Sequence, residues 1–394
     1  MNRCYFDHNA TTPLAPEVAQ AMADVLCNGF GNPSSVHQEG QAARQLLEGA
    51  RRRIGSIVGA DQTEIVFTSG GTESNNLAIL GITRGVLRSG KHVITSAIEH
   101  PAVLEPCRQL QREGFDVTFL PVDRNGGVSA EDVGRHLKPE TVLVSIMHAN
   151  NEVGTVQPIA EIAEIVRAAR CLGRQIYLHS DGVQAPGRIP VDMGRLKVDL
   201  YSLSAHKVHG PKGSGALYVR KGVRLPGIQL GGRHERGRRA GTENVAAAVA
   251  FSKAMELSDS IYIRDQVKVL RDEFERNLLS RMDEVEINGA AAERLPNTSN
   301  LHFRGVDGQA LVIALDLKGF AVSSGSACSS GSIEPSHVLL AMGRSASEAR
   351  SSVRFSFGSG NTLAEVHALA DAVISSVRHL RASHHVREDE YVPA

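Results

Sequence analysis

The chain has 394 residues, of which 42% are hydrophobic, so it can bury a large core, and we expect one large and one smaller domain. Lysine plus arginine and aspartate plus glutamate number 43 each, and this balance disfavours a nucleic-acid or membrane-surface partner. Residues 1–12 lack a signal-peptide pattern and no run is long enough to span a bilayer, which predicts a cytoplasmic protein. The five cysteines include no Cys-x-x-Cys pair, so neither a disulfide framework nor a zinc site is indicated.

Seven short apolar runs alternate with helical patterns after a polar N-terminal segment and a helix over 17–26. Strands this apolar, separated by helices, are typical of a mostly parallel sheet covered on both faces, which predicts an α/β fold with a seven-stranded sheet. In such sheets the ligand binds at the carboxyl ends of the strands. The predicted strands cover residues 65–68, 92–95, 117–120, 142–147, 176–179, 200–204 and 216–219.

A smaller α+β domain is expected after a long helix over 262–282, with strands near 285–288, 300–303 and 353–356 and a last helix over about 363–380. We place the large, cofactor-binding domain at residues 15–260. The small domain is expected to combine residues 1–14 with 261–382, and residues 383–394 are expected to form a flexible tail.

The first predicted strand is followed by Ser69 to Asn75, a glycine-containing turn before a helix. Free backbone amides at a helix N-terminus, here at Gly71, Thr72 and Glu73, can bind a phosphate together with the Thr72 hydroxyl. The same residues are also compatible with an ordinary turn and helix cap.

Lys207 follows the strand over 200–204, and Ser204 and His206 lie beside it. A desolvated lysine loses basicity, so its amine becomes available for Schiff-base chemistry with an aldehyde. For a lysine taken at random, a surface position that caps a strand is the commoner use. The hydroxyl, the imidazole and the glycine-rich segment around this lysine favour an anchored phosphate.

Pyridoxal phosphate requires a lysine, a carboxylate for its ring nitrogen, phosphate donors and a planar group over its ring. Residues at the strand ends fill these roles: Lys207, Asp181, Thr72 with Ser204 and His206, and His100. A metal hydrolase that uses His206 and His209 is a competing interpretation. It is disfavoured because this pair lies in a glycine-rich loop and lacks the helical spacing of histidine metal ligands.

Two later residues are further candidates. Cys328 lies in a run of small and polar residues over 323–332, where a thiol can act as a nucleophile that moves. Arg354, in the predicted strand over 353–356, could bind a carboxylate with two parallel hydrogen bonds or serve as a salt-bridge partner. The basic, glycine-rich segment over 230–244 could bind an anion, although a solvated loop is its ordinary reading.

Together these motifs resemble the cysteine desulfurases of the NifS/IscS type, from about Tyr5 to Leu380. They are Thr-Ser-Gly-Gly-Thr-Glu-Ser-Asn-Asn at 68–76, Ile-Glu-His-Pro-Ala-Val at 98–103, Asn-Asn-Glu-Val-Gly at 150–154, Ser-Ala-His-Lys at 204–207 and Ser-Gly-Ser-Ala-Cys-Ser-Ser-Gly at 324–331. Gly-Arg-Arg-Ala-Gly-Thr-Glu-Asn at 237–244 resembles the NifS form.

The resemblance implies a homodimeric fold-type I pyridoxal phosphate enzyme in which Thr242 reaches the phosphate of the neighbouring subunit. It also implies that L-cysteine displaces Lys207 from the cofactor, and that Arg354 and Asn151 hold the substrate carboxylate. Gln184 would bond the ring oxygen, and His100, over the ring, would move protons.

In the same resemblance, Cys328 takes the sulfur as a persulfide and alanine leaves. The sulfur then passes to an iron-sulfur scaffold or another acceptor protein, with nitrogenase clusters as one destination. No permanent metal is implied, although Cys328 could bridge an iron-sulfur cluster transiently. A selenocysteine lyase or an aminotransferase would share Lys207 and Asp181 but would not need Cys328, and a catalytically silent scaffold would need neither Lys207 nor Cys328.

Overall fold

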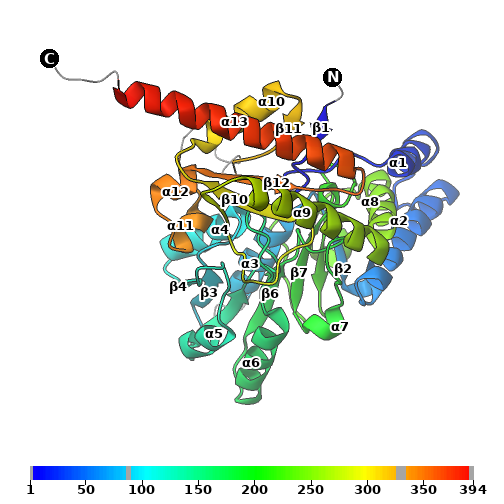
Figure 1. Cartoon of the computed structure of the whole chain (residues 1–394). Helices are drawn as coiled ribbons and strands as arrows, with labels where there is room; N and C mark the ends of the chain where they lie inside the picture. The colour runs from blue at the N-terminus through cyan, green and yellow to red at the C-terminus, as the bar shows by residue number, and fades with distance from the viewer. Residues whose placement is uncertain (1–2, 86–89, 325–333, 390–394) are drawn as a thin grey trace.

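The computed structural model describes residues 3–85, 90–324 and 334–389, and its centre is one seven-stranded sheet (Figure 1). The strand order is β2-β8-β7-β6-β5-β3-β4. β8 runs antiparallel to β2 and β7, while the remaining pairs are parallel, which confirms the predicted mostly parallel sheet. The strands are β2 (Ile65–Thr68), β3 (His92–Ser96), β4 (Asp116–Leu120), β5 (Thr141–Ser145), β6 (Tyr177–Asp181), β7 (Leu200–Ser204) and β8 (Gly215–Val219).

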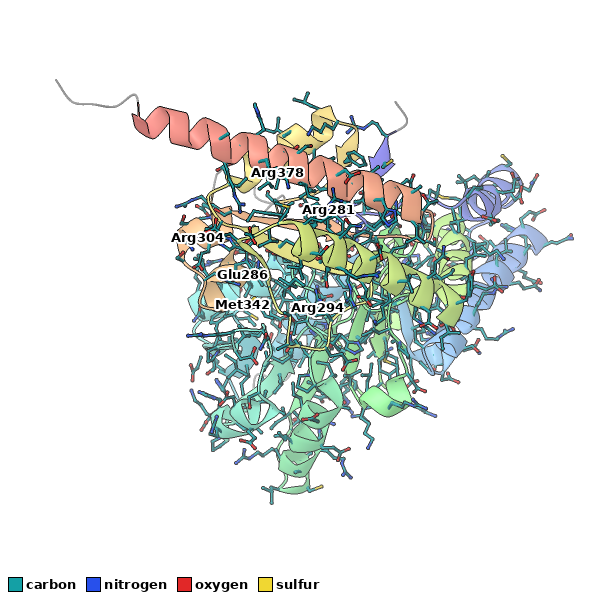
Figure 2. All side chains as sticks on the ribbon, in the orientation of Figure 1. Arg281, Glu286, Arg294, Arg304, Met342 and Arg378 are labelled. Carbon is teal, nitrogen blue, oxygen red and sulfur yellow. The ribbon has the colours of Figure 1, made fainter. Side chains whose placement is uncertain are left out.

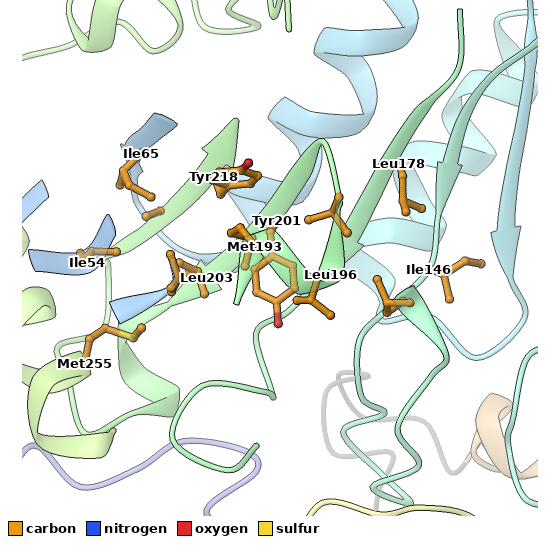
Figure 3. Packing of buried hydrophobic residues seen from close by; sticks show 14 of the residues in the cluster. Ile54, Ile65, Ile146, Leu178, Met193, Leu196, Tyr201, Leu203, Tyr218 and Met255 are labelled. Carbon is orange, nitrogen blue, oxygen red and sulfur yellow. The ribbon is translucent and has the colours of Figure 1, made fainter. Parts of the chain in front are cut away.

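Helices cover both faces of this sheet because successive side chains of each strand point to opposite faces. Ile65 and Phe67 belong to one buried cluster, whereas Val66, between them, belongs to another. Figure 3 shows the first cluster, in which Tyr201 lies among side chains from strands and from helices that include Ile54 and Met255. The helices of this part are α1 (Pro16–Asn28), α2 (Gln38–Ile57), α3 (Gly71–Gly85), α4 (Pro101–Arg112), α5 (Ala130–His136), α6 (Ile159–Cys171), α7 (Met193–Leu196) and α8 (Val245–Ser258).

A second, smaller core lies above the sheet in Figure 1 and is built from a three-stranded antiparallel sheet of order β12-β10-β9. Two further short strands, β1 and β11, pair in parallel. The elements are β1 (Cys4–Tyr5), α9 (Ile261–Arg281), β9 (Val285–Ile287), β10 (Thr298–Phe303), α10 (Gly308–Leu317), β11 (Phe320–Ala321), α11 (His337–Ala341), α12 (Ala346–Arg350), β12 (Ser352–Ser356) and α13 (Leu363–Asp389).

Aromatic rings and two arginine ion pairs hold this smaller core together. Phe274 of α9 packs against Phe355 of β12 with ring centroids 4.7 Å apart. Figure 2 shows Arg281 and Arg294 close to α9. Arg281 pairs with Asp371 of α13 at 2.7 Å, and Arg294 pairs with Glu275 of α9 through both of its terminal nitrogens at 2.8 and 3.0 Å.

The N-terminal segment packs with the smaller core, because Phe6 is fully buried within that cluster. The predicted domain boundaries themselves stay a prediction. The last helix differs from expectation, since α13 continues to Asp389 and thus includes residues that we assigned to the tail. No glycine or proline interrupts its sequence, so nothing in the chain forces the helix to end near residue 380.

Among the residues that the structure describes, no helix combines the length and the apolar character needed to cross a membrane.

Candidate active site

A cavity of about 220 Å³, which we call the cofactor pocket, lies at the strand ends where the site was predicted. It brings together most of the predicted residues, although they are spread over nearly 300 positions of the chain. Those that line it are Gly71, Thr72, His100, Asn151, Asp181, Gln184, Ser204, His206, Lys207 and Arg354.

The start of α3 forms one wall of the cofactor pocket. Gly71 begins this helix, and a Cβ atom on Gly71 would approach Val183 Cγ2 to 2.7 Å and Ser204 Cβ to 3.7 Å. A larger residue would therefore fill the space in front of the helix N-terminus. The first-turn amides have no acceptor within the helix, so this end is suited to an anionic group.

Asp181, at the end of β6, is buried, and both of its carboxylate oxygens accept a hydrogen bond. The Asn75 side-chain amide donates to Oδ2 at 2.7 Å, and the Val183 backbone amide donates to Oδ1 at 3.0 Å. These two donors fix the orientation of the carboxylate. Each carboxylate oxygen has a second lone pair, so Asp181 can still accept a hydrogen bond from a protonated ring nitrogen.

Lys207 lies in a 3-10 turn over Ala205–Lys207 that directly follows β7. Its amine donates to the backbone carbonyls of Asn9 at 2.5 Å and Ala10 at 2.8 Å. The N-terminal segment therefore positions the amine at the edge of the cofactor pocket.

Two histidines of the cofactor pocket are neutral at pH 7. Burial, together with the nearby positive charges of Lys207 and Lys212, lowers the pKa of His206 to about 4. Burial also lowers the pKa of His100, whose Nδ1 accepts a hydrogen bond from the Ala102 backbone amide at 3.0 Å and so caps α4. The remaining proton of the neutral His100 ring therefore resides on Nε2.

Arg354, in β12, is buried and already has partners. Its Nη2 donates to Asp7 Oδ1 at 2.6 Å, and its Nη1 donates to the Asn151 backbone carbonyl at 3.1 Å. Its Nε is buried without a hydrogen-bond partner. A substrate carboxylate would satisfy this donor, and it would share the guanidinium with Asp7.

Asn9 connects several parts of the site. Its carbonyl accepts from the Gln184 side chain at 3.0 Å as well as from Lys207, and its side-chain amide donates to Thr298 Oγ1 at 2.8 Å and to the Asn151 carbonyl at 3.1 Å. In addition, Asn9 Oδ1 accepts from Asn297 at 2.9 Å. One buried residue thus joins the two cores beside the pocket.

Three predicted site residues lie elsewhere. The Glu73 carboxylate pairs with Arg239 at 2.9 Å and accepts from the Ser69 backbone amide at 2.7 Å, so it is turned to the side of α3. Thr242 is exposed and lines a separate cavity that also contains Arg239. Cys328 lies outside the described residues.

Sequence reasoning missed Asp7, Asn9, Ala10 and Asn75. The available signal was the polar segment before the first helix, residues 7–12, which we noted only as a polar entry. Asn75 belongs to the motif at 68–76, but no rule of spacing assigns its side chain to Asp181.

The residues present fit pyridoxal phosphate on chemical grounds. One cavity is lined by an amine, a buried carboxylate with a fixed orientation, neutral imidazoles and a helix N-terminus. A glycine at that N-terminus leaves space in front of it.

The comparisons with known proteins agree with this assignment. The model of the family described as aminotransferase class-V matches residues 4–369. The chain is 46% identical to the cysteine desulfurase IscS of Dictyoglomus turgidum, with 96% of this chain and 95% of that protein covered. It is also 46% identical to an IscS cysteine desulfurase of Pseudomonas aeruginosa, with 96% and 93% covered.

Solved structures show the same relationship. A NifS-like protein superposes with a TM-score of 0.89 at 36% identity and covers 96% of this chain and 100% of its own. The structure described as SspA in complex with cysteine superposes with a TM-score of 0.81 at 37% identity, and the match covers 91% of this chain and 99% of that one.

The chain belongs to the aminotransferase class-V family, and its fold is that of the NifS-like members. Within this family it belongs to the cysteine desulfurases, which depend on pyridoxal phosphate.

Proposed function

We propose that this protein converts L-cysteine to L-alanine and passes the sulfur to a persulfide on Cys328, for iron-sulfur cluster assembly. The observation that supports this most strongly is that Lys207, Asp181 and Arg354 line one cavity. An amine for the cofactor, a carboxylate for its ring and a cation for the substrate are thereby brought together. When bound, pyridoxal phosphate supplies the electron sink that labilises bonds next to the substrate amino group.

Arg354 orients the substrate. Its unpartnered Nε and its Nη atoms can bind a carboxylate, while Asp7 holds the guanidinium in place. We propose that the Asn151 side chain, which lines the pocket, assists, since the Asn151 carbonyl already accepts from Arg354. The substrate sulfur would then project away from the arginine.

Lys207 and His100 are the proposed proton donors and acceptors of the site. The Asn9 and Ala10 carbonyls accept hydrogen bonds from the Lys207 amine and would hold it beside the bound substrate. A neutral His100 with its proton on Nε2 can donate that proton and recover it later. Arg188 Nη1 donates to Gln184 Oε1 at 2.6 Å. This bond fixes the orientation of the Gln184 amide, so the Gln184 side-chain nitrogen can act as a donor toward the pocket.

The phosphate would be bound by the Gly71, Thr72 and Glu73 amides together with Ser204 and His206. We also propose a homodimer in which Thr242 reaches the partner's phosphate, since Thr242 is exposed and does not line the cofactor pocket of its own chain. The sulfur acceptor is proposed to be an iron-sulfur scaffold protein in the cytoplasm. Supply of nitrogenase clusters stays a prediction from the motif at 237–244.

The sulfur step needs a thiolate. Cys328 would attack the substrate sulfur, a sulfur-sulfur bond would form, and the carbon-sulfur bond would break with its electron pair left on the carbon fragment. That fragment takes up protons and leaves as alanine. A selenocysteine lyase or an aminotransferase would proceed without this thiol.

Replacement of Cys328 tests the proposal. Purified Cys328→Ala protein should keep the cofactor absorbance of the wild type but release no sulfide from L-cysteine in the presence of a thiol reductant. Cys171→Ala, at an exposed cysteine outside the pocket, should behave as the wild type. Sustained sulfide release by the Cys328→Ala protein would rule out the persulfide route.

A further inference from the structure

A second cavity, of about 440 Å³, also reaches Lys207. This volume is in the range of small-molecule sites. Its walls come from residues 12–17, from the turn over 186–188, from the start of α9 and from the loop over 357–360. We call it the second cavity.

The walls of the second cavity are largely apolar. Val208 belongs to the core of the large sheet, whereas Val267 and Phe357 belong to the smaller core, and Leu257 and Ile263 complete the lining. The cavity therefore lies where the two cores meet, a place at which ligand sites are common.

One cation is buried in this apolar lining. Arg188 is 8% exposed, and its Nη atoms donate to the Gln184 carbonyl and side chain, to the His8 carbonyl and to the Lys207 carbonyl, at 2.9, 2.6, 3.1 and 3.4 Å. All four acceptors are neutral oxygens. Arginine has five N–H groups, and the Nε–H of Arg188 has no hydrogen bond among the described residues.

No carboxylate compensates this charge within the described part of the chain. Burial, together with the positive charge of nearby Arg354, lowers the pKa of Arg188 to about 9. A buried cation without a counter-ion is costly, so the site favours an anion.

The other polar groups of the lining do not supply the anion. Arg264 is paired with Asp259 at 3.4 Å, and Glu17 is exposed. His8 is buried and its pKa is lowered to about 3, so it is neutral, and its Nδ1 is buried without a partner. The buried Arg188 guanidinium therefore has no carboxylate partner among the described residues, and Lys207, which also lines the second cavity, lies next to it.

We propose that the second cavity binds a small monocarboxylate with a short apolar chain. The carboxylate pairs with Arg188 and accepts from its Nε–H, and the chain packs between Leu257 and Phe357. A neutral analogue would leave the cation uncompensated, and a dianion would be poorly matched to one arginine in an apolar cavity.

Calorimetric titration of the holoenzyme with hexanoate, and with hexanamide as the neutral control, tests this site. We expect one hexanoate per chain and at least tenfold weaker binding of hexanamide. Arg188→Gln should weaken hexanoate binding at least tenfold. Arg354→Gln should keep hexanoate binding within a few-fold of the wild type, because that arginine lines the cofactor pocket and not the second cavity.

A second pair of variants tests the site independently, in case the Arg188→Gln protein does not fold. Ile263→Trp would fill the second cavity and should abolish hexanoate binding, whereas Ile313→Trp, at a position of α10 that is 54% exposed and far from the lining, should not. Absence of binding to the wild type, equal binding to Ile263→Trp, or loss of binding in Arg354→Gln would overturn the proposal. Because the measurement is of binding, none of these results bears on cysteine turnover.

Discussion

The cofactor pocket and the second cavity both reach Lys207, but the charged side chains in their walls have different hydrogen-bond partners. In the cofactor pocket, Asp181 has two donors and Arg354 has a carboxylate partner. In the second cavity, the hydrogen bonds that Arg188 makes to described residues all go to neutral oxygens. Charges that take part in chemistry are held in orientation by fixed partners, whereas an uncompensated buried charge indicates a ligand.

Removal of the Lys207 amine should have the largest effect. Lys207→Ala is expected to lose the absorbance of the covalently attached cofactor and to reduce turnover about a thousandfold or more, because no other lysine among the described residues lines the cofactor pocket. Absorption spectra of the purified variant, together with alanine formation from L-cysteine, measure both. Turnover within tenfold of the wild type would mean that Lys207 is not the attachment site.

Arg354 should be the next most sensitive position. Charge-assisted hydrogen bonds contribute about 1.5–3 kcal/mol each, so Arg354→Gln is expected to lower kcat/KM about a hundredfold, mainly through KM. Arg304→Gln provides a matched control, since the side chain of this arginine is 75% exposed and it lines neither cavity. A change in kcat alone would place Arg354 outside substrate binding.

Asn9 lies between the two regions and should matter for stability as well as for rate. Asn9→Ala keeps the backbone carbonyl that accepts from Lys207, but it removes one buried hydrogen bond each from Thr298 and Asn297, whose side chains then keep only their bond to each other and the longer bond from Asn297 to the Phe357 carbonyl. We expect about 2–3 kcal/mol of destabilisation and roughly a tenfold lower kcat. Urea unfolding and steady-state kinetics measure the two effects. Asn28→Ala, at the exposed end of α1, should alter neither.

The pKa values of two histidines offer a smaller but direct contrast. Without the cofactor, His206 and His8 have pKa values lowered to about 4 and about 3. Both are below the unfolded value of about 6.5, so each histidine disfavours folding increasingly as the pH falls from 6.5 towards its folded pKa. Phosphate next to His206 favours the imidazolium.

NMR titration of histidine-labelled protein follows this contrast. Addition of pyridoxal phosphate should raise the pKa of His206 by about one unit or more and leave that of His8 within a few tenths of a unit. Equal shifts at the two histidines, or no shift at His206, would contradict the proposed position of the phosphate.

The sequence predicts the cofactor pocket better than the second cavity because of how each is built. Gly71 and Lys207 each follow a strand, Asp181 is the last residue of one, and these strand ends meet at one edge of the sheet. The seven strands themselves were predicted to within two residues at each end, since alternation of buried runs and helices is a strong signal.

Contacts between distant segments are what the sequence does not reveal. Lys207 bonds to Asn9, which lies 198 positions away, and no local pattern indicates such a pair. The second cavity is lined by turns and helix ends from both cores, so it exists only once they have packed. Arg188 looks in the sequence like an ordinary arginine after a turn, and only the structure shows that it is buried with its hydrogen bonds going to neutral oxygens.

Product analysis tests most directly whether the cofactor pocket carries out cysteine desulfuration. Incubation of the purified holoenzyme with L-cysteine and dithiothreitol should yield alanine and sulfide in equal amounts. Pyruvate and ammonia in place of alanine, or sulfide without alanine, would contradict the claim.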